Sequence, residues 1–91
     1  MNNDVVNYIK CVSAPDRPIS GSSIASHFGI TDVDVRKKVS EARKAGIPIC
    51  SVRYGYYYST DKSDIAKTID SLRRRISSQE SAITGLAALL T

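Results

Sequence analysis

The order of the folded elements is decided by residues 19–59, ISGSSIASHFGITDVDVRKKVSEARKAGIPICSVRYGYYYS. Two segments in this stretch have the apolar spacing of amphipathic helices, and each is followed at once by a glycine, Gly29 or Gly46. Glycine readily adopts the left-handed conformation that ends a helix. The residues after Gly46 are rich in strand formers around a second turn. The stretch therefore predicts helix, tight turn, helix and hairpin.

The two helices have recognisable starts. The shorter one begins among Ser20–Ser23, where serine is a favourable N-cap residue, and its inward side chains are Ile24, Ala25 and Phe28. Ile19, just before it, sits in a short extended piece. The second helix runs from Asp32 to about Ala45, and Thr31 with Asp34 resembles a capping box. Its core stripe, at helical spacing, is Val35, Val39 and Ala42.

The hairpin is predicted from Ile47 to Tyr58, with a turn at Arg53-Tyr54-Gly55. Pro48 suggests a strand start or an edge, because proline cannot donate a backbone hydrogen bond. Side chains alternate between the faces of a strand, so Tyr56 and Tyr58 share one face and Tyr57 lies on the other. We expect Tyr56 and Tyr58 to pack on the second helix.

A further helix precedes this stretch. It runs from Asp4 to about Ser13, and Pro15 and Pro18 stop it because proline disrupts helix continuation. Val5, Ile9 and Val12 share its apolar face, with Tyr8 beside them.

The composition is that of a globular protein, because 42% of its 91 residues are hydrophobic and 24% are charged. This length allows one compact domain with an appendage. The formal net charge of +4 favours an anionic partner. Between Arg36 and Arg53 there are six cations and one anion, so the positive charge is concentrated on the second helix and the hairpin.

Several classes of function and location are not expected. Cys11 and Cys50 read as reduced thiols packed like small hydrophobes, and no metal site is expected. His27 has no catalytic partner at suitable spacing, so we expect no enzymatic activity and no cofactor. No signal peptide is recognisable, and the apolar run 86–90 is too short to span a bilayer. We expect a cytoplasmic protein without a membrane partner.

The last third of the chain has the pattern of a coiled coil. Thr60 or Asp61 caps a long helix, which divides the chain into a domain at 1–60 and an oligomerisation helix at 61–91. From Ile65 the apolar residues alternate at spacings of four and three. The expected oligomerisation residues are Ile69, Leu72, Ile76, Gln79, Ile83, Leu86 and Leu90.

Isoleucine at the a positions with leucine at d favours a parallel two-stranded coil. Arg75 and Glu80 fall at the g and e positions that pair across parallel strands. The pattern also leaves open an antiparallel pair, a tetramer or a larger oligomer.

The exposed face of the 32–45 helix carries groups that can read DNA. Rotation at about 100° per residue places Val33, Arg36, Lys37, Ser40 and Lys44 opposite the core stripe. Arginine and lysine donate to guanine acceptors or to phosphates, and valine can contact a thymine methyl group. Asp32 and Asp34 are interpreted as caps that complement the helix dipole.

A basic helix behind a tight turn, followed by a hairpin, is typical of a winged helix-turn-helix. The fold class we expect is therefore mainly α with a small β-hairpin wing, plus a C-terminal coiled-coil helix. The expected DNA-binding residues are Thr31, Val33, Arg36, Lys37, Lys38, Ser40, Lys44, Arg53 and Tyr54.

Residues 19–59 resemble the winged-helix domain at the N-terminus of biotin protein ligase repressors. The matching text is ISGSSIASHFGIT at 19–31 and VDVRKKVSEARKAGIPICSVRYGYYYS at 33–59, so the resemblance covers about 41 of 91 residues. It implies that the 32–45 helix reads DNA and that the wing contacts the adjacent backbone or minor groove. The family often has a basic residue where Asp32 stands. Nothing here resembles the ligase's catalytic domain, so biotin transfer is not implied. The chain looks more like stand-alone phage and bacterial regulators.

The favoured hypothesis is a homodimeric protein that binds double-stranded DNA sequence-specifically, as a repressor-like transcriptional regulator. One alternative is a phage replication or DNA-packaging factor that binds DNA as a larger oligomer. Another is a protein-interaction adaptor that uses the same fold without DNA.

Overall fold

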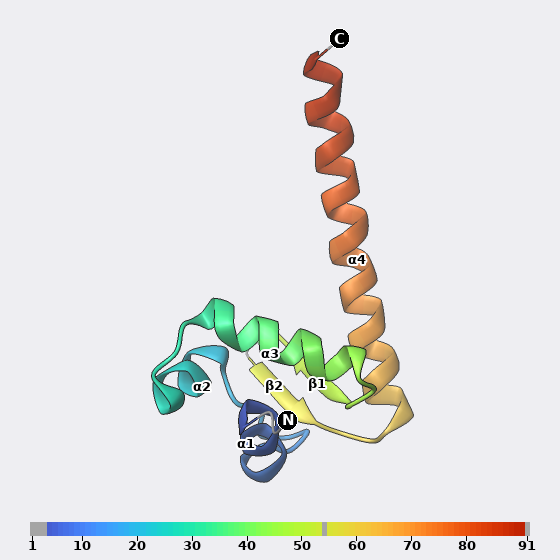
Figure 1. The fold of residues 1–91 in the computed structure, drawn as a ribbon. Helices are drawn as coiled ribbons and strands as arrows, with labels where there is room; N and C mark the ends of the chain where they lie inside the picture. The colour runs from blue at the N-terminus through green and yellow to red at the C-terminus, as the bar shows by residue number, and fades with distance from the viewer. Residues whose placement is uncertain (1–3, 54, 91) are drawn as a thin grey trace.

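The chain forms a small head of three helices and a hairpin, from which one long helix projects (Figure 1). The structure, a computed structural model, describes residues 4–53 and 55–90. Its elements are α1 (Asp4–Val12), α2 (Gly21–Phe28), α3 (Asp32–Lys44), β1 (Ile49–Val52), β2 (Gly55–Tyr58), α4 (Lys62–Ala87) and a final 3₁₀ turn (Ala88–Leu90). The predicted mainly helical fold with a small hairpin and a long C-terminal helix is confirmed. We call residues 4–59 the head.

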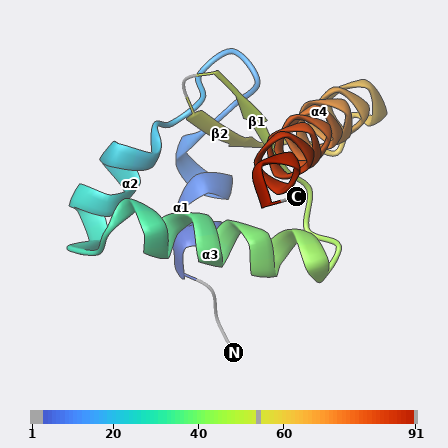
Figure 2. The same ribbon diagram turned by 90° about the horizontal axis from the view of Figure 1, so that it is seen from above.

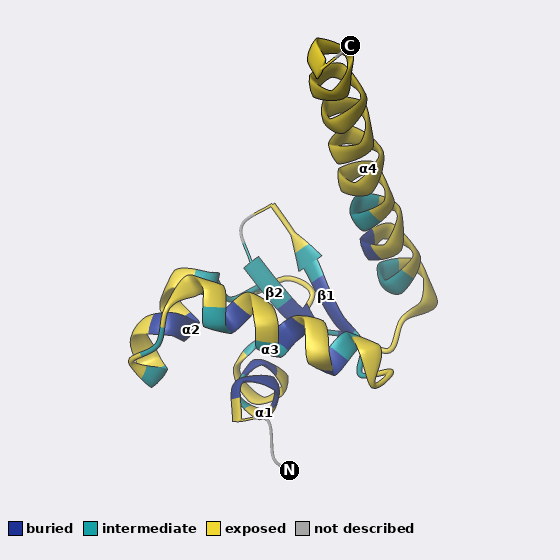
Figure 3. Ribbon diagram, turned by 45° about the horizontal axis from the view of Figure 1, so that its top comes forward, coloured by how far each residue is buried: buried dark blue, intermediate teal, exposed yellow. Residues whose placement is uncertain are grey.

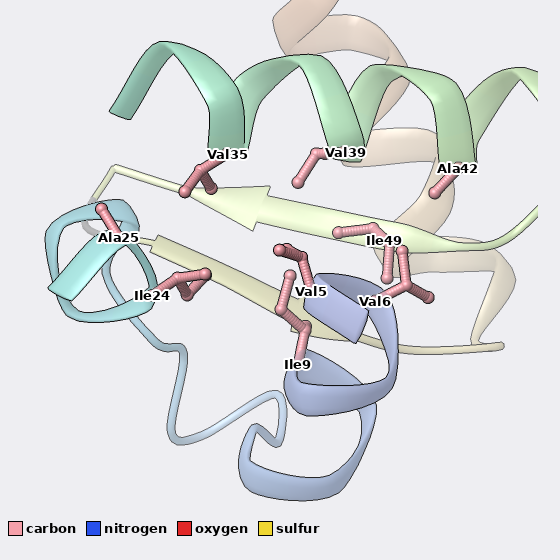
Figure 4. Close-up of a cluster of buried hydrophobic side chains, with 9 residues drawn as sticks. All are labelled: Val5, Val6, Ile9, Ile24, Ala25, Val35, Val39, Ala42 and Ile49. Carbon is pink, nitrogen blue, oxygen red and sulfur yellow. The ribbon is translucent and has the colours of Figure 1, made fainter. Parts of the chain in front are cut away.

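The core of the head lies beneath α3. Val35, Val39 and Ala42 point from α3 toward α1 and the hairpin (Figure 4). Ile9 and Ile24 meet them from α1 and α2, and both are fully buried. Each such aliphatic side chain contributes about 1.5–3 kcal/mol when it leaves water. The stripe predicted for α3 is therefore the face that anchors this helix.

The apolar face predicted for α1 is partly wrong. Val5 and Ile9 are buried as expected, but Val12 is 43% exposed and Val6 is buried instead. The buried side of α1 includes both Val5 and Val6, and Val12 is the last residue of the helix. Cys11 is also exposed, in contrast to the buried thiol that was expected, while Cys50 is buried.

A serine begins α2 and a glycine ends it. Ser20 is the N-cap of α2, and its hydroxyl accepts a hydrogen bond from the Ser23 N–H at 3.0 Å. At the other end Gly29 is left-handed, with φ of 66°. The Ile30 N–H then donates to the Ala25 carbonyl at 3.0 Å. This turn fixes the angle at which α3 leaves α2.

The hairpin is covered on both of its faces. Ile49 pairs with Tyr58 on the face that looks toward the core, and Cys50 pairs with Tyr57 on the opposite face. Tyr57 is the most buried of these tyrosines, with 4% of its surface exposed. Burial raises its pKa to about 12, and Asp64 of α4 adds to the rise. The second face is buried because the start of α4 lies across it.

Tyr56 and Tyr58 are half-buried and pack on the core, as the alternation predicted. Their helical neighbours differ. The Arg43 guanidinium of α3 lies 6.0 Å from the Tyr56 ring centre, and Lys10 of α1 lies 5.0 Å from that of Tyr58. These contacts place the Tyr56 ring beside α3 and the Tyr58 ring beside α1.

The first turns of α4 are tied to the head. Asp61 is the N-cap of the helix, and the Ser59 hydroxyl donates to the Asp64 carboxylate at 2.8 Å. Thr68 is buried, and its hydroxyl oxygen accepts a hydrogen bond from the Ser51 N–H at 3.2 Å. From Arg73 to the last described residue α4 is exposed (Figure 3). The boundary predicted between residues 60 and 61 thus falls at the cap, but the base of α4 packs with the head.

Ile19 pairs with the outer edge of β2 through an isolated antiparallel bridge to Tyr56. Its N–H and carbonyl exchange hydrogen bonds with Tyr56, both at 2.8 Å. A Cβ atom at Gly55 would lie 2.3 Å from the Ile19 carbonyl oxygen. Glycine at this position is therefore what allows the two backbones to approach.

We expect Gly55→Ala to lower the free energy of unfolding by about 1–3 kcal/mol, because the added methyl group must displace the Ile19 backbone. Urea denaturation followed by circular dichroism measures this. Gly85→Ala is the matched control, since a Cβ there meets nothing within 4 Å. It should stabilise helix α4 by about 0.5–1 kcal/mol. Equal stability of Gly55→Ala and the wild type would contradict the close approach.

Candidate nucleic-acid interface

A complete capping box begins α3. The Thr31 hydroxyl accepts from the Asp34 N–H at 3.1 Å, and the Asp34 carboxylate accepts from the Thr31 N–H at 3.3 Å. These hydrogen bonds, the backbone one foremost, lower the pKa of Asp34, and the charges of Lys37 and Lys38 lower it further. The capping box predicted from the sequence is confirmed, with aspartate in place of the usual glutamate. Asp34 thus has a structural role at this end of the helix.

The outer face of α3 is exposed and mainly basic. Arg36, Lys37 and Lys44 are all exposed on it. Ser40 and Val33 lie between them, and Val33 is 47% exposed. Because the core stripe holds the opposite side of α3 against the head, this face is the one that a partner can reach. These five predicted residues share one surface.

The other predicted residues are placed differently. Thr31 is exposed but its hydroxyl serves the cap, and Lys38 is half-buried on the flank of α3 that carries Asp34. Arg53 is exposed in the hairpin turn. Tyr54 lies outside the described residues. Whether any of these residues contacts DNA stays a prediction.

A hollow of about 700 Å³ opens between α3, the hairpin, the N-terminus of α2 and α4. Figure 2 shows how these elements are arranged, with α4 seen nearly along its axis. Among the described residues, five basic side chains line it against one acidic side chain, Asp32. The basic residues are Arg36, Arg43, Lys44, Arg53 and Arg75. The hollow therefore brings together four predicted DNA-binding residues, three basic ones and Ser40, and two basic residues that were not predicted from the sequence to bind DNA.

Arg43 was missed because it borders the core stripe. Its spacing of seven from Arg36, which places both on one flank of a helix, could have revealed it. The Arg43 Nε donates to the Ile49 carbonyl at 2.8 Å, while its Nη2 is buried and has no hydrogen-bond partner among the described residues. Burial lowers the pKa of Arg43, and the charge of Arg75 lowers it further. Arg75 was missed because only the tertiary structure brings α4 to this place.

The apolar stripe of α4 is uncovered over most of its length. Ile69 is 42% exposed, Ile83 is 65% exposed and Leu90 is 89% exposed. Ile76 and Leu86 are exposed between them, and so is Gln79. Leu72 differs, because it is half-buried and borders the head. The stripe thus begins at the head and runs outward along the helix, and Gln79 is the polar residue within it.

Residues 4–53 and 55–90 hold no cluster of three or more metal-ligating side chains. Within the same ranges, every helix is too short or too polar to cross a bilayer.

Comparison with known proteins adds no relative: no family model, no curated protein and no solved structure matches this chain.

We expect Asp34→Ala to lower the free energy of unfolding at neutral pH. The loss should be smaller in acid. The lowered pKa means that the carboxylate contributes stability above about pH 4, and that this contribution is lost as the pH falls through the folded-state pKa. Urea denaturation midpoints at several pH values measure the gap between variant and wild type. Asp32→Ala, another acid in the first turn, is the control. A gap for Asp34→Ala that does not narrow in acid would contradict the role of the cap.

Proposed function

We propose that this protein binds double-stranded DNA sequence-specifically, with α3 in the major groove, and acts as a dimeric transcriptional regulator. The observation that carries the proposal is the exposed basic outer face of α3, held outward by a core on the opposite side. An α-helix fits the major groove, where each base pair presents a distinct set of hydrogen-bonding groups.

The side chains on α3 suit two kinds of contact. Arg36 lies in the first half of the helix, where a recognition helix meets base edges. Lys44 lies at the other end of the helix and Arg53 lies on the hairpin, and both would contact backbone phosphates. The resemblance of residues 19–59 to the biotin ligase repressor domain supports the same assignment. Phosphate contacts make binding weaken steeply as salt increases.

We expect Arg36→Ala to weaken binding to the preferred DNA sequence by about 1–3 kcal/mol and to relax the preference at one base pair. The preferred sequence is first selected from random duplex DNA, and affinities are then measured by fluorescence anisotropy. Arg17→Ala is the matched control, because Arg17 is equally charged and exposed but lies in the loop between α1 and α2. Equal losses for both variants, or no salt-sensitive binding by the wild type, would contradict the proposal. The second result would favour a protein-interaction adaptor.

Self-association through α4 is supported by the uncovered stripe. Its isoleucine and leucine side chains at spacings of four and three are those of a two-stranded coiled coil. Pairing two stripes removes this apolar surface from water, which stabilises the pair by about 25 cal/mol for each Å² buried. Because Leu72 already borders the head, the freely available part of the stripe starts at Ile76. Parallel pairing places two heads on one duplex and makes a two-fold symmetric site the expected target.

We expect the wild type to sediment at twice the chain mass and Ile83→Glu to sediment as a single chain, because pairing would bury an unpaired carboxylate. Ser81→Glu is the control, since it adds the same charge to the same exposed turn but lies off the stripe. A wild-type monomer would contradict pairing. A mass of eight or more chains would favour the replication or packaging factor instead.

A further inference from the structure

The hollow beside α3 gathers positive charge from three separate parts of the chain. Arg36, Arg43 and Lys44 come from α3, Arg53 from the hairpin and Arg75 from α4. Asp32 is the one acid that lines it in the described part of the chain, which leaves an excess of four positive charges there. An anion that enters the hollow is attracted by this excess of positive charge.

Arg43 contributes a guanidinium whose position is fixed by contacts with the hairpin. Its Nε donates a hydrogen bond to the Ile49 carbonyl, and its guanidinium lies near the Tyr56 ring. These two contacts restrict the position of the guanidinium. Its Nη2 is buried and finds no acceptor among the described residues. The Arg43 side chain lines the hollow, and a phosphate oxygen is a strong acceptor for a guanidinium.

Two further features of the wall favour an anion. The N-terminus of α2, at Ser20–Ser22, borders the hollow, and a helix N-terminus carries partial positive charge. The base of α4 stands on the other side, where Arg75 is exposed and faces the hollow. Its charge acts on Arg43 across the space between α4 and α3.

We propose that this hollow binds a backbone phosphate of the duplex that lies along α3, and that Arg75 of α4 is one of its ligands. The inference rests on the proposed function and extends it, because it makes α4 part of the DNA-binding surface as well as the dimerisation element. Figure 1 shows why the geometry allows this: α3 lies along the upper side of the head, and α4 rises past its C-terminal end. A duplex on the outer face of α3 therefore has the base of α4 beside it.

This assignment differs from a coiled-coil role for Arg75. In a parallel pair, Arg75 would reach toward Glu80 of the other chain. Within a single chain it faces the hollow instead. The two roles give opposite expectations for Glu80→Gln, which removes the coiled-coil partner and leaves the hollow unchanged.

The test measures affinity for duplex DNA at several salt concentrations in the wild type, Arg75→Gln and Arg74→Gln. Arg74 is the matched control, because it is the adjacent arginine of α4, is exposed and does not line the hollow. Each phosphate contact contributes about 0.9 to the slope of log affinity against log salt. We expect Arg75→Gln to lower that slope by about one contact, while Arg74→Gln and Glu80→Gln keep the wild-type slope. Sedimentation of all variants checks that their mass is unchanged.

Each outcome decides between defined alternatives. Equal slopes for Arg75→Gln and Arg74→Gln, with DNA bound by the wild type, overturn this inference and leave the proposed function intact. A loss shared by Arg75→Gln and Glu80→Gln overturns it in favour of pairing between helices. Calorimetry with inorganic phosphate separates the sources: binding that depends on Arg75, with an unchanged DNA slope, identifies a site for a free anion and overturns the DNA assignment. No DNA binding by the wild type overturns both proposals.

Discussion

The two-sided burial of the β1–β2 hairpin is the constraint on which the rest of the structure depends. One face, with Ile49, closes the core formed by α1, α2 and α3. The other face, with Cys50 and Tyr57, lies under the base of α4. A two-stranded hairpin is marginal in water by itself, so it needs cover on at least one side. Here the cover on both sides joins the head to the long helix.

The same hairpin sets the surroundings of the basic residues. Its Ile49 carbonyl holds Arg43, its Tyr56 ring lies beside that guanidinium, and its turn carries Arg53. The pairing of Tyr56 with Ile19 also brings the N-terminus of α2 to the same place. The hollow is therefore a product of packing around the hairpin, and the positive charges face one another because four elements meet there.

Helix α4 combines two surfaces that the sequence presents as one pattern. Near the head, Thr68 and Leu72 lie against the hairpin and the hollow. Farther out, Ile76, Ile83 and Leu86 continue the stripe without any cover in a single chain. One continuous apolar pattern can serve both, because side chains three and four residues apart stay on one side of a helix. The first part fixes where the helix points, and the second part is available to another copy.

Local rules in the sequence were sufficient for the elements and their ends. Thr31 and Asp34 identify the start of α3, and Gly29 and Gly46 identify the ends of α2 and α3, because capping and left-handed turns depend on a few neighbouring residues. The helical period likewise identified the core stripe of α3 and hence its outer face. These features need no knowledge of the rest of the chain.

Tertiary structure decided which residues from distant parts of the chain contact one another. Tyr57 is buried and Arg75 faces Arg43 because of where α4 runs, and no local period encodes that direction. The exposed face of α3 could be predicted from periodicity, since it depends on one helix. The hollow could not, because it forms only where residues more than fifty positions apart in the chain come together, from Ser20 to Arg75.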